Sequence, residues 1–286
     1  MQTSLQRLPD QTLELTLAVP WSRVSKVYEE VLDELVKNTQ LPGFRKGKAP
    51  RKLVEEKADK TRTYEEVLKR LIPQIYSEAI GELKLHPITT PKIELKQATE
   101  GKDWIIRALT CEKPEVTLGD YKSKIVELKA GKQKKIWVPG QTEPKSAEAE
   151  KEQKVTLDEI LTSLYQVITV NLPALLVEQE VNRLLSELID QTRKLGISVE
   201  QYLASTGRTA ESLRREYQEQ AKRQLSLEFA LETIADQESI LVSDDDIDNL
   251  IKNAKTAAER EALTNQRYYL ATLLRRQKTL DFLVSL

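Results

Sequence analysis

The chain has 286 residues, of which 31% are charged and 5% aromatic, and its formal net charge is −1. This balance predicts a helix-rich protein and argues against a general polyanion binder, so any contact with nucleic acid needs a local basic patch. The only cysteine is Cys111 and the only histidine is His86, which excludes an intrachain disulfide and disfavours both metal sites and His-dependent catalytic triads. We therefore expect no metal ion, no cofactor and no catalytic residue.

The first third of the chain predicts a compact α+β domain over residues 1–113. Residues 12–19 alternate apolar and polar side chains, as a strand with one buried face does. Later segments repeat apolar residues at spacings of three and four, as amphipathic helices do. The expected elements are strands at 12–19, 88–95 and 104–111 and helices at 20–40, from about 50 and at 62–83.

Residues 114–155 predict an extended linker. Residues 114–130 contain Pro114 and Gly119 as chain breaks, and the stretch from Gly131 onward is poor in core residues. One small apolar group, Ile136-Trp137-Val138, is expected to dock as an anchor. The alternative is that it forms a residual substrate contact.

Residues 156–286 predict a helical domain. Two capping boxes mark helix starts, Thr156 with Glu159 and Ser198 with Gln201. Residues 151–286 carry 17 Lys and Arg against 22 Asp and Glu, so this part of the chain is acidic. The expected helices begin at Thr156, near Pro173, at Ser198, at Thr209, at Ser243 and near Thr264.

No apolar run reaches the length of a signal peptide core or of a membrane-spanning helix. The sequence therefore predicts a cytosolic protein with no membrane partner.

A basic loop interrupts the predicted N-terminal helices. Residues 35–54 contain six basic side chains and no acidic one, which predicts a local positive field. The basic residues are Lys37, Arg45, Lys46, Lys48, Arg51 and Lys52.

The tip of this loop has an unusual composition. Gly43 and Gly47 give backbone freedom on either side of it, and Pro50 suits the first turn of the next helix. Phe44 stands beside Arg45, which suits a contact that is partly apolar and partly phosphate. The alternative is a solvated loop whose Phe44 folds back onto its own core.

The stretch Leu41-Pro42-Gly43-Phe44-Arg45-Lys46-Gly47-Lys48-Ala49-Pro50 resembles the ribosome-binding signature of the bacterial trigger factor family. The segment from Lys113 to Tyr121 resembles that family's exit from its N-terminal domain. The resemblance implies that Phe44, Arg45 and Lys46 contact a ribosomal protein and ribosomal RNA beside the nascent-chain exit. The residues implied for ribosome binding are Gly43, Phe44, Arg45, Lys46, Gly47, Lys48 and Pro50.

The resemblance also implies the architecture. It predicts an α+β ribosome-binding domain, an extended linker in place of the family's FKBP-like prolyl-isomerase domain, and an all-α chaperone domain with SurA-like helical arms. Residues 126–155 are too few to form the isomerase domain. Phrases such as Leu172-Pro173-Ala174-Leu175 and Lys278-Thr279-Leu280-Asp281 are similar to the family's C-terminal module.

The function implied is that of an ATP-independent chaperone that binds the large ribosomal subunit and unfolded nascent polypeptides, aiding folding and export. The sequence holds no Gly-x-x-x-x-Gly-Lys-Ser/Thr loop for ATP. Two alternatives stay open, a prolyl isomerase by family label and an RNA-binding ribosome-assembly factor. The expected location is the cytoplasm, partly on ribosomes, and weak homodimer formation away from the ribosome is left open.

Overall fold

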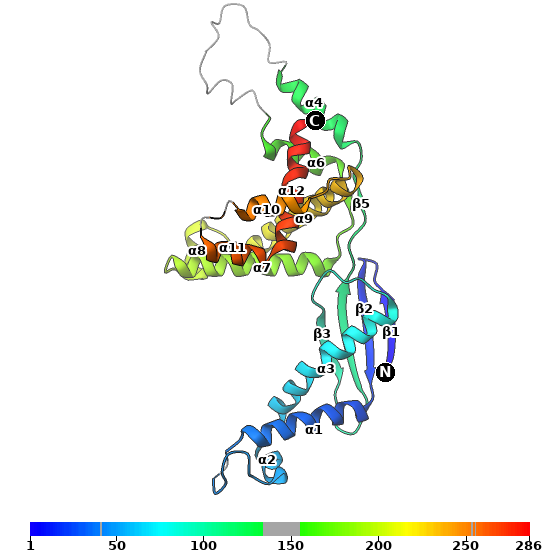
Figure 1. The fold of residues 1–286 in the computed structure, drawn as a ribbon, viewed down its shortest axis with the longest axis vertical. Helices are drawn as coiled ribbons and strands as arrows, with labels where there is room; N and C mark the ends of the chain where they lie inside the picture. The colour runs from blue at the N-terminus through cyan, green and yellow to red at the C-terminus, as the bar shows by residue number, and fades with distance from the viewer. Residues whose placement is uncertain (41, 134–154, 253, 255) are drawn as a thin grey trace, which may run out of the picture. The chain divides into compact units, whose positions relative to one another are not determined.

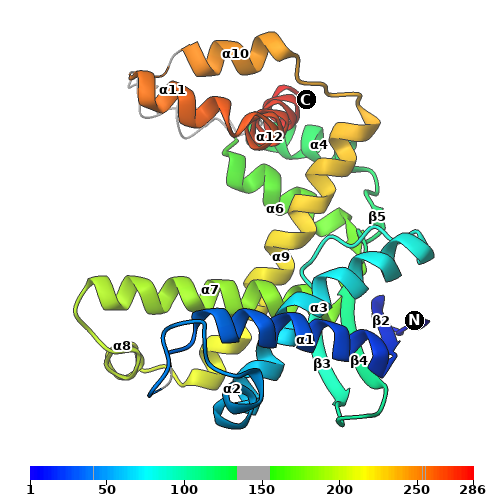
Figure 2. The same cartoon turned by 60° about the horizontal axis from the view of Figure 1, so that its bottom comes forward.

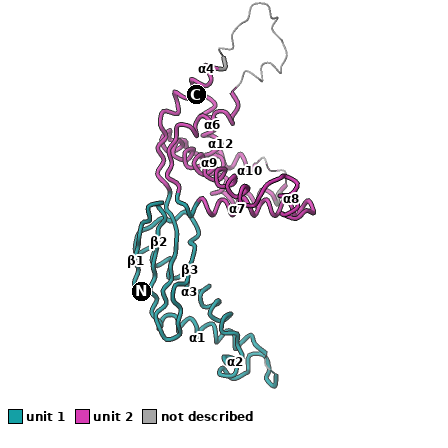
Figure 3. The backbone as a smooth tube through the Cα atoms, turned by 180° about the vertical axis from the view of Figure 1, so that it is seen from behind, with its two compact units in different colours: residues 1–113, 173–176 teal, residues 114–172, 177–286 magenta. Residues whose placement is uncertain are grey.

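The computed structural model describes residues 1–40, 42–133, 155–252, 254 and 256–286 (Figure 1). The chain forms two compact units (Figure 3). Residues 1–113 and 173–176 make up the first, and residues 114–172 and 177–286 the second. That residues 173–176 join the first unit was not predicted from the sequence.

The first unit contains a four-stranded antiparallel sheet in the order β1-β2-β4-β3. Its strands are β1 (Gln2–Arg7), β2 (Thr12–Val19), β3 (Lys92–Gln97) and β4 (Trp104–Cys111). The two central strands, β2 and β4, have the bounds that their alternating pattern predicted.

The two edge strands differ from the sequence prediction. β3 begins only at Lys92, directly after Pro91, which has no N–H to donate to a neighbouring strand. β1 was not predicted, because Leu5 stands among polar residues. Its pairing with β2, which sets Leu5 opposite Leu15, is a tertiary contact that local pattern does not reveal.

The described helices that lie wholly in the first unit are α1 (Trp21–Asn38), α2 (Arg51–Lys57) and α3 (Lys60–Leu83). Asp59 caps α3, since its carboxylate accepts the backbone N–H of Thr61 at 2.9 Å. α1 and α3 pack on one face of the sheet (Figure 2) and bury their apolar stripes there. The buried core consists of Leu13, Leu15, Leu17, Val19, Val24, Val27, Val31, Val67, Leu71, Ile75, Ala79, Leu85, Trp104, Ile106 and Ala108.

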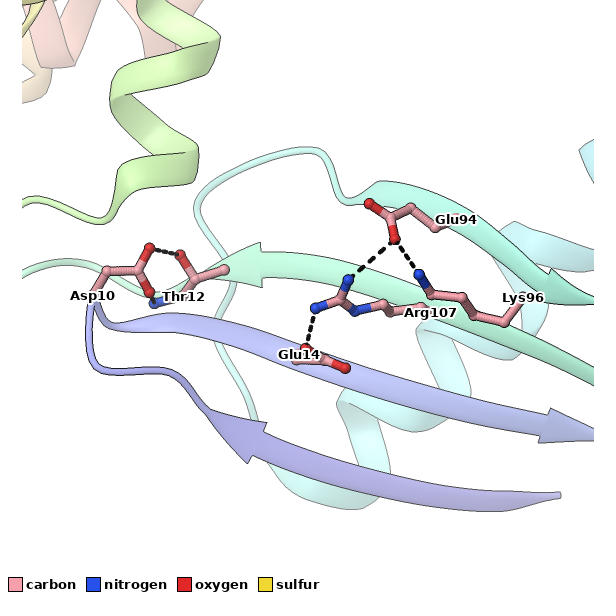
Figure 4. Close-up of polar contacts among 6 residues, drawn as sticks. All are labelled: Asp10, Thr12, Glu14, Glu94, Lys96 and Arg107. Atoms are coloured by element: carbon pink, nitrogen blue, oxygen red, sulfur yellow. Dashed lines mark hydrogen bonds and ion pairs between the residues drawn. The ribbon is translucent and has the colours of Figure 1, made fainter.

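The opposite face of the sheet carries an ion-pair ladder across three strands (Figure 4). Arg107 on β4 bonds Glu14 on β2, and its Nη1 donates to Glu94 on β3 at 3.1 Å. Lys96 adds a second cation to Glu94 at 2.9 Å. The sheet therefore has one apolar and one charged face, as antiparallel sheets covered on one side do.

In its described residues, the second unit is helical apart from a two-residue pairing of β5 (Val116–Thr117) with β6 (Thr169–Val170). That short pairing was not predicted. The described helices are α4 (Tyr121–Gln133), α6 (Leu157–Val167), α7 (Ala174–Lys194, of which residues 174–176 belong to the first unit), α8 (Val199–Thr206), α9 (Ala210–Gln237), α10 (Asp244–Lys252), α11 (Ala257–Thr264) and α12 (Arg267–Ser285).

Several helix starts in the second unit are confirmed. The capping boxes predicted at Thr156 and Ser198 both form, and the hydroxyl of Thr209 caps α9. The hydroxyl of Ser243 accepts the backbone N–H of Asp246 at 3.2 Å at the start of α10. The last predicted helix, expected from near Thr264, corresponds to α12, which begins at Arg267. The short helix α11, which ends at Thr264, was not predicted.

The expectation of an extended linker is wrong for residues 121–133, which form α4. Asp120 caps this helix, with its carboxylate accepting the backbone N–H of Ser123 at 3.2 Å. Tyr121 and Ile125 stand four residues apart on one face and are buried. The helix was not predicted because Pro114 and Gly119, just before Asp120, are typical of extended or loop segments.

α4 is part of the second unit's core, together with α6, α9 and α12. The buried residues of that core are Leu118, Tyr121, Ile125, Ile160, Leu164, Ala230, Leu231, Ile234 and Leu283. Residues 134–154 of the predicted linker, including Ile136-Trp137-Val138, lie outside the described residues.

Candidate functional site

The basic loop joins α1 to α2 and lies beyond the C-terminal end of α1, away from the sheet (Figure 1). α1 ends at Asn38, and Thr39 turns to extended backbone while its N–H still donates to the carbonyl of Leu35 at 2.9 Å. All loop residues from Thr39 to Pro50 except Leu41 are among the described residues.

The neck of the loop is closed against the end of α1. The backbone N–H of Gly47 donates to the carbonyl of Thr39 at 3.2 Å. Gly47 has a φ of +75°, and a Cβ placed on it would lie 3.1 Å from the carbonyl oxygen of Lys37. Gly43 also has positive φ, at +86°, so both glycines have the backbone conformation for which they were singled out.

The tip of the loop presents its side chains to solvent. Phe44 is 39% exposed, so it does not fold back fully onto the core. Arg45, Lys46 and Lys48 are exposed, and within the described part of the chain none of them forms an ion pair. A turn bond from the N–H of Lys48 to the carbonyl of Arg45, at 3.0 Å, holds the two ends of the tip together.

The base of the loop is anchored by apolar contacts. Ala49 is buried, Pro50 precedes the first turn of α2, and Val54 on α2 is 2% exposed. The loop therefore changes from solvent-facing to core-facing within a few residues, which holds its tip on a fixed base.

Arg51 differs from the other basic residues of the cluster. Its guanidinium is half-buried and pairs with two carboxylates of α1, those of Glu29 and Asp33. Its charge is therefore compensated, and the exposed positive field comes from its neighbours. The sequence did not reveal this difference.

The two residues that could have supported other chemistry, Cys111 and His86, lie in the first unit, away from the loop. Cys111 is buried, and that burial raises the pKa of its thiol. The backbone N–H of His86 donates to the carboxylate of Glu112 at 3.0 Å. Among the described residues, no three His, Cys, Asp or Glu side chains gather to hold a metal ion.

No helix in the described ranges combines the length and the apolarity needed to cross a lipid bilayer.

The second unit exposes apolar side chains on its helices. Tyr268 and Tyr269, at the start of α12, are 88% and 61% exposed, and Leu273 follows on the same helix. Leu195 and Leu241 are exposed in the connections after α7 and α9. Sequence reasoning placed apolar stripes on these helices but did not single out these residues. Two adjacent tyrosines in a chain with few aromatics were the available signal.

Comparison with known proteins covers both units. Two family models match, "Bacterial trigger factor protein (TF)" over residues 1–136 and "Bacterial trigger factor protein (TF) C-terminus" over residues 140–285. Residues 137–139 are all that separates the two matches.

Individual relatives match over shorter stretches. The trigger factor of Streptococcus mutans serotype c is 35% identical over 133 residues, 46% of this chain and 31% of that protein. The trigger factor of Staphylococcus epidermidis is 38% identical over 113 residues, 40% of this chain and 26% of that protein. The matched stretch thus spans less than a third of either relative.

A solved structure has the same fold along the whole chain. It is described as "Promiscuous Substrate Recognition in Folding and Assembly Activities of the Trigger Factor Chaperone". The TM-score is 0.65 at 13% identity, covering 100% of this chain and 99% of the other. With family models matching over residues 1–136 and 140–285, the chain belongs to the trigger factor family.

Proposed function

We propose that this chain is an ATP-independent chaperone that docks on the large ribosomal subunit at the nascent-chain exit and shields newly made polypeptides. The observation that carries the proposal is the loop of the first unit. It presents a partly exposed Phe44 between two glycines, next to exposed cations that have no ion pair in the described part of the chain.

The chemistry of the tip suits a mixed ribosomal surface. Arg45 and Lys46 can take phosphate oxygens of ribosomal RNA, the Arg in bidentate fashion. Phe44 can enter an apolar depression on a ribosomal protein. Gly43, Gly47, Lys48 and Pro50 complete the proposed docking loop, through backbone shape and one further cation.

The helices of the second unit are proposed to hold the nascent chain. Unfolded polypeptides expose apolar side chains without a fixed order, so weak and dispersed apolar contacts bind many of them. Tyr268, Tyr269 and Leu273 on α12 supply exposed surface of this kind. Charged residues interspersed between such contacts keep the surface soluble.

The docking loop is tested by Phe44→Ala/Arg45→Ala/Lys46→Ala in the full chain. We expect this variant to lose co-sedimentation with ribosomes while its thermal unfolding stays unchanged. The matched control, Lys26→Ala/Lys69→Ala, removes two exposed cations of the same unit outside the loop and should sediment like the unsubstituted chain. Full retention of binding by the triple variant would reject the docking assignment.

A competition experiment separates ribosome docking from general RNA binding. We expect naked ribosomal RNA to compete weakly, because the tip offers few phosphate contacts, and we expect the competition to fade as salt rises. Competition by naked RNA as strong as that by ribosomes would favour the RNA-binding assembly factor instead.

We also propose that the chain does not act as a prolyl isomerase. Only residues 137–139 lie between the two family matches, which supports this view. Refolding of a proline-limited substrate should therefore proceed at its uncatalysed rate, with no response to an FKBP ligand. Catalytic acceleration at substoichiometric concentration would contradict this.

The proposed location is the cytoplasm, partly on ribosomes.

A further inference from the structure

Arg51 stands directly after the docking loop, as the first residue of α2. Unlike the cations of the tip, it has two carboxylate partners. Its Nη2 bonds Glu29, and its Nη1 lies 3.2 Å from Asp33 Oδ1. Glu29 and Asp33 are four residues apart and so lie on one face of α1. The planar guanidinium can fork between them as an ammonium cannot.

A second polar tie links the same two helices. The hydroxyl of Tyr28 on α1 donates to Glu55 Oε1 on α2 at 3.3 Å. Val54, adjacent to Glu55, is buried. The short helix α2, which lies in contact with α1, is therefore also held to it by polar contacts near both of its own ends.

These ties act on the loop because α2 is its outgoing end. The incoming end is α1 itself, and the neck is closed by the bond from Gly47 N–H to the carbonyl of Thr39. With both ends held on α1, the tip between them has a restricted set of orientations. If α2 came away from α1, the bond from Gly47 to Thr39 would still close the neck, but the outgoing end of the loop would no longer be held.

We propose that Arg51 is a positioning residue, which orients the Phe44-Arg45-Lys46 tip by holding α2 on α1, and that it does not itself contact ribosomal phosphate. This inference rests on the docking function proposed above. We call the group of Arg51, Glu29 and Asp33 the Arg51 clamp.

The partner carboxylates provide the sharpest test, because the two roles of Arg51 predict opposite results. Glu29→Gln/Asp33→Asn removes two negative charges beside a basic surface and frees Arg51. If Arg51 served as a phosphate ligand, ribosome binding would tighten and its salt dependence would steepen. If Arg51 is a positioning residue, binding weakens by about two- to fivefold, the range expected for loss of exposed ion pairs.

The matched control is Glu30→Gln/Glu56→Gln. It removes two exposed acids from the same two helices, and neither forms an ion pair among the described residues. We expect its ribosome affinity to be unchanged or slightly higher. An equal loss of affinity in this control would overturn the inference.

Arg51→Gln should weaken binding about as much as Glu29→Gln/Asp33→Asn, and combining all three changes should add nothing, because the same clamp is removed. The slope of affinity against salt should stay as in the unsubstituted chain. A fall of about one unit in that slope would identify Arg51 as a phosphate contact and overturn the inference.

One measurement is independent of the ribosome. Arg51→Gln should speed hydrogen exchange of the Gly47 amide in the free full chain, and Arg51→Lys should restore part of its protection. If the Gly47 amide exchanges at the same rate in Arg51→Gln as in the unsubstituted chain, the positioning role of Arg51 is wrong, whether or not the loop docks. If the unsubstituted chain fails to bind ribosomes, the docking proposal fails, and this exchange measurement still decides the role of the clamp.

Discussion

Gly47 is the described position in the docking loop where positive φ and a close backbone atom together dictate the residue type. Its φ is +75°, and an added Cβ would lie 3.1 Å from the carbonyl oxygen of Lys37. We expect Gly47→Ala to cost about 1–3 kcal/mol of local strain and to displace the tip. Chemical denaturation and ribosome affinity should both report the change.

Gly81 supplies the matched control. It lies inside α3 with ordinary φ, and a Cβ there meets no atom within 4 Å. Gly81→Ala should therefore raise stability by up to about 1 kcal/mol, because alanine favours the helix. If Gly47→Ala and Gly81→Ala changed the free energy of unfolding in the same direction, the strain assigned to Gly47 would be refuted.

The residue-scale features differ in how far the sequence predicts them. The backbone conformation of Gly43 and Gly47 and the partial exposure of Phe44 could be predicted because they depend on a few neighbouring residues. The pairing of Arg51 could not be predicted. Its partners Glu29 and Asp33 come earlier in the chain and reach Arg51 only when α1 and α2 pack together.

Helix α4 is an element that the sequence could have predicted but that was missed. Its capping residue Asp120 and the apolar pair Tyr121 and Ile125 were present in the sequence. Pro114 and Gly119, just before them, nevertheless favoured the prediction of an extended segment. The structure buries Ile125 completely, while its neighbour Val126 is 48% exposed. This contrast gives a direct test of whether the segment belongs to the core.

We expect Ile125→Ala to destabilise the chain by about 2–5 kcal/mol, because it opens a cavity in a packed core. Val126→Ala should change stability by no more than about 0.5 kcal/mol. Urea unfolding followed by circular dichroism measures both. Two equally mild variants would mean that residues 121–133 do not belong to the core of the second unit.

The contact between α10 and α12 depends on charge. The Lys278 ammonium lies 2.6 Å from Asp246 Oδ2, and Ser243 donates to the same oxygen. These hydrogen bonds, that of Lys278 foremost, lower the pKa of Asp246 from 3.8 to about 2. Because the folded pKa is depressed, the ionised carboxylate stabilises the contact above about pH 4, and this contribution is lost as pH falls towards 2.

A carboxyl-carbon titration followed by NMR should therefore place the pKa of Asp246 near 2. In Lys278→Met it should move up towards 3.8. Arg276→Met, which changes an exposed arginine of the same helix, should leave it in place. A value near 3.8 in the unsubstituted chain would show that the Lys278 contact does not persist in solution.

At the scale of the whole molecule, each unit contributes a different half of the proposed function. The first presents a basic, aromatic tip on a fixed base, and the second presents exposed apolar side chains on helices. The family, and with it the general fold, could be inferred from the loop signature and the C-terminal phrases. Which apolar residues stay exposed, such as Tyr268, depends on tertiary packing, and periodicity alone does not reveal it.

Site-specific photocrosslinking on stalled ribosome–nascent-chain complexes tests the central claim most directly. A photoreactive phenylalanine at position 44 should crosslink to large-subunit components whether or not a nascent chain is present. The same group at position 269 should crosslink to the nascent chain and only when one is present. Absence of ribosomal crosslinks from position 44, with the protein otherwise folded, would contradict docking through this loop.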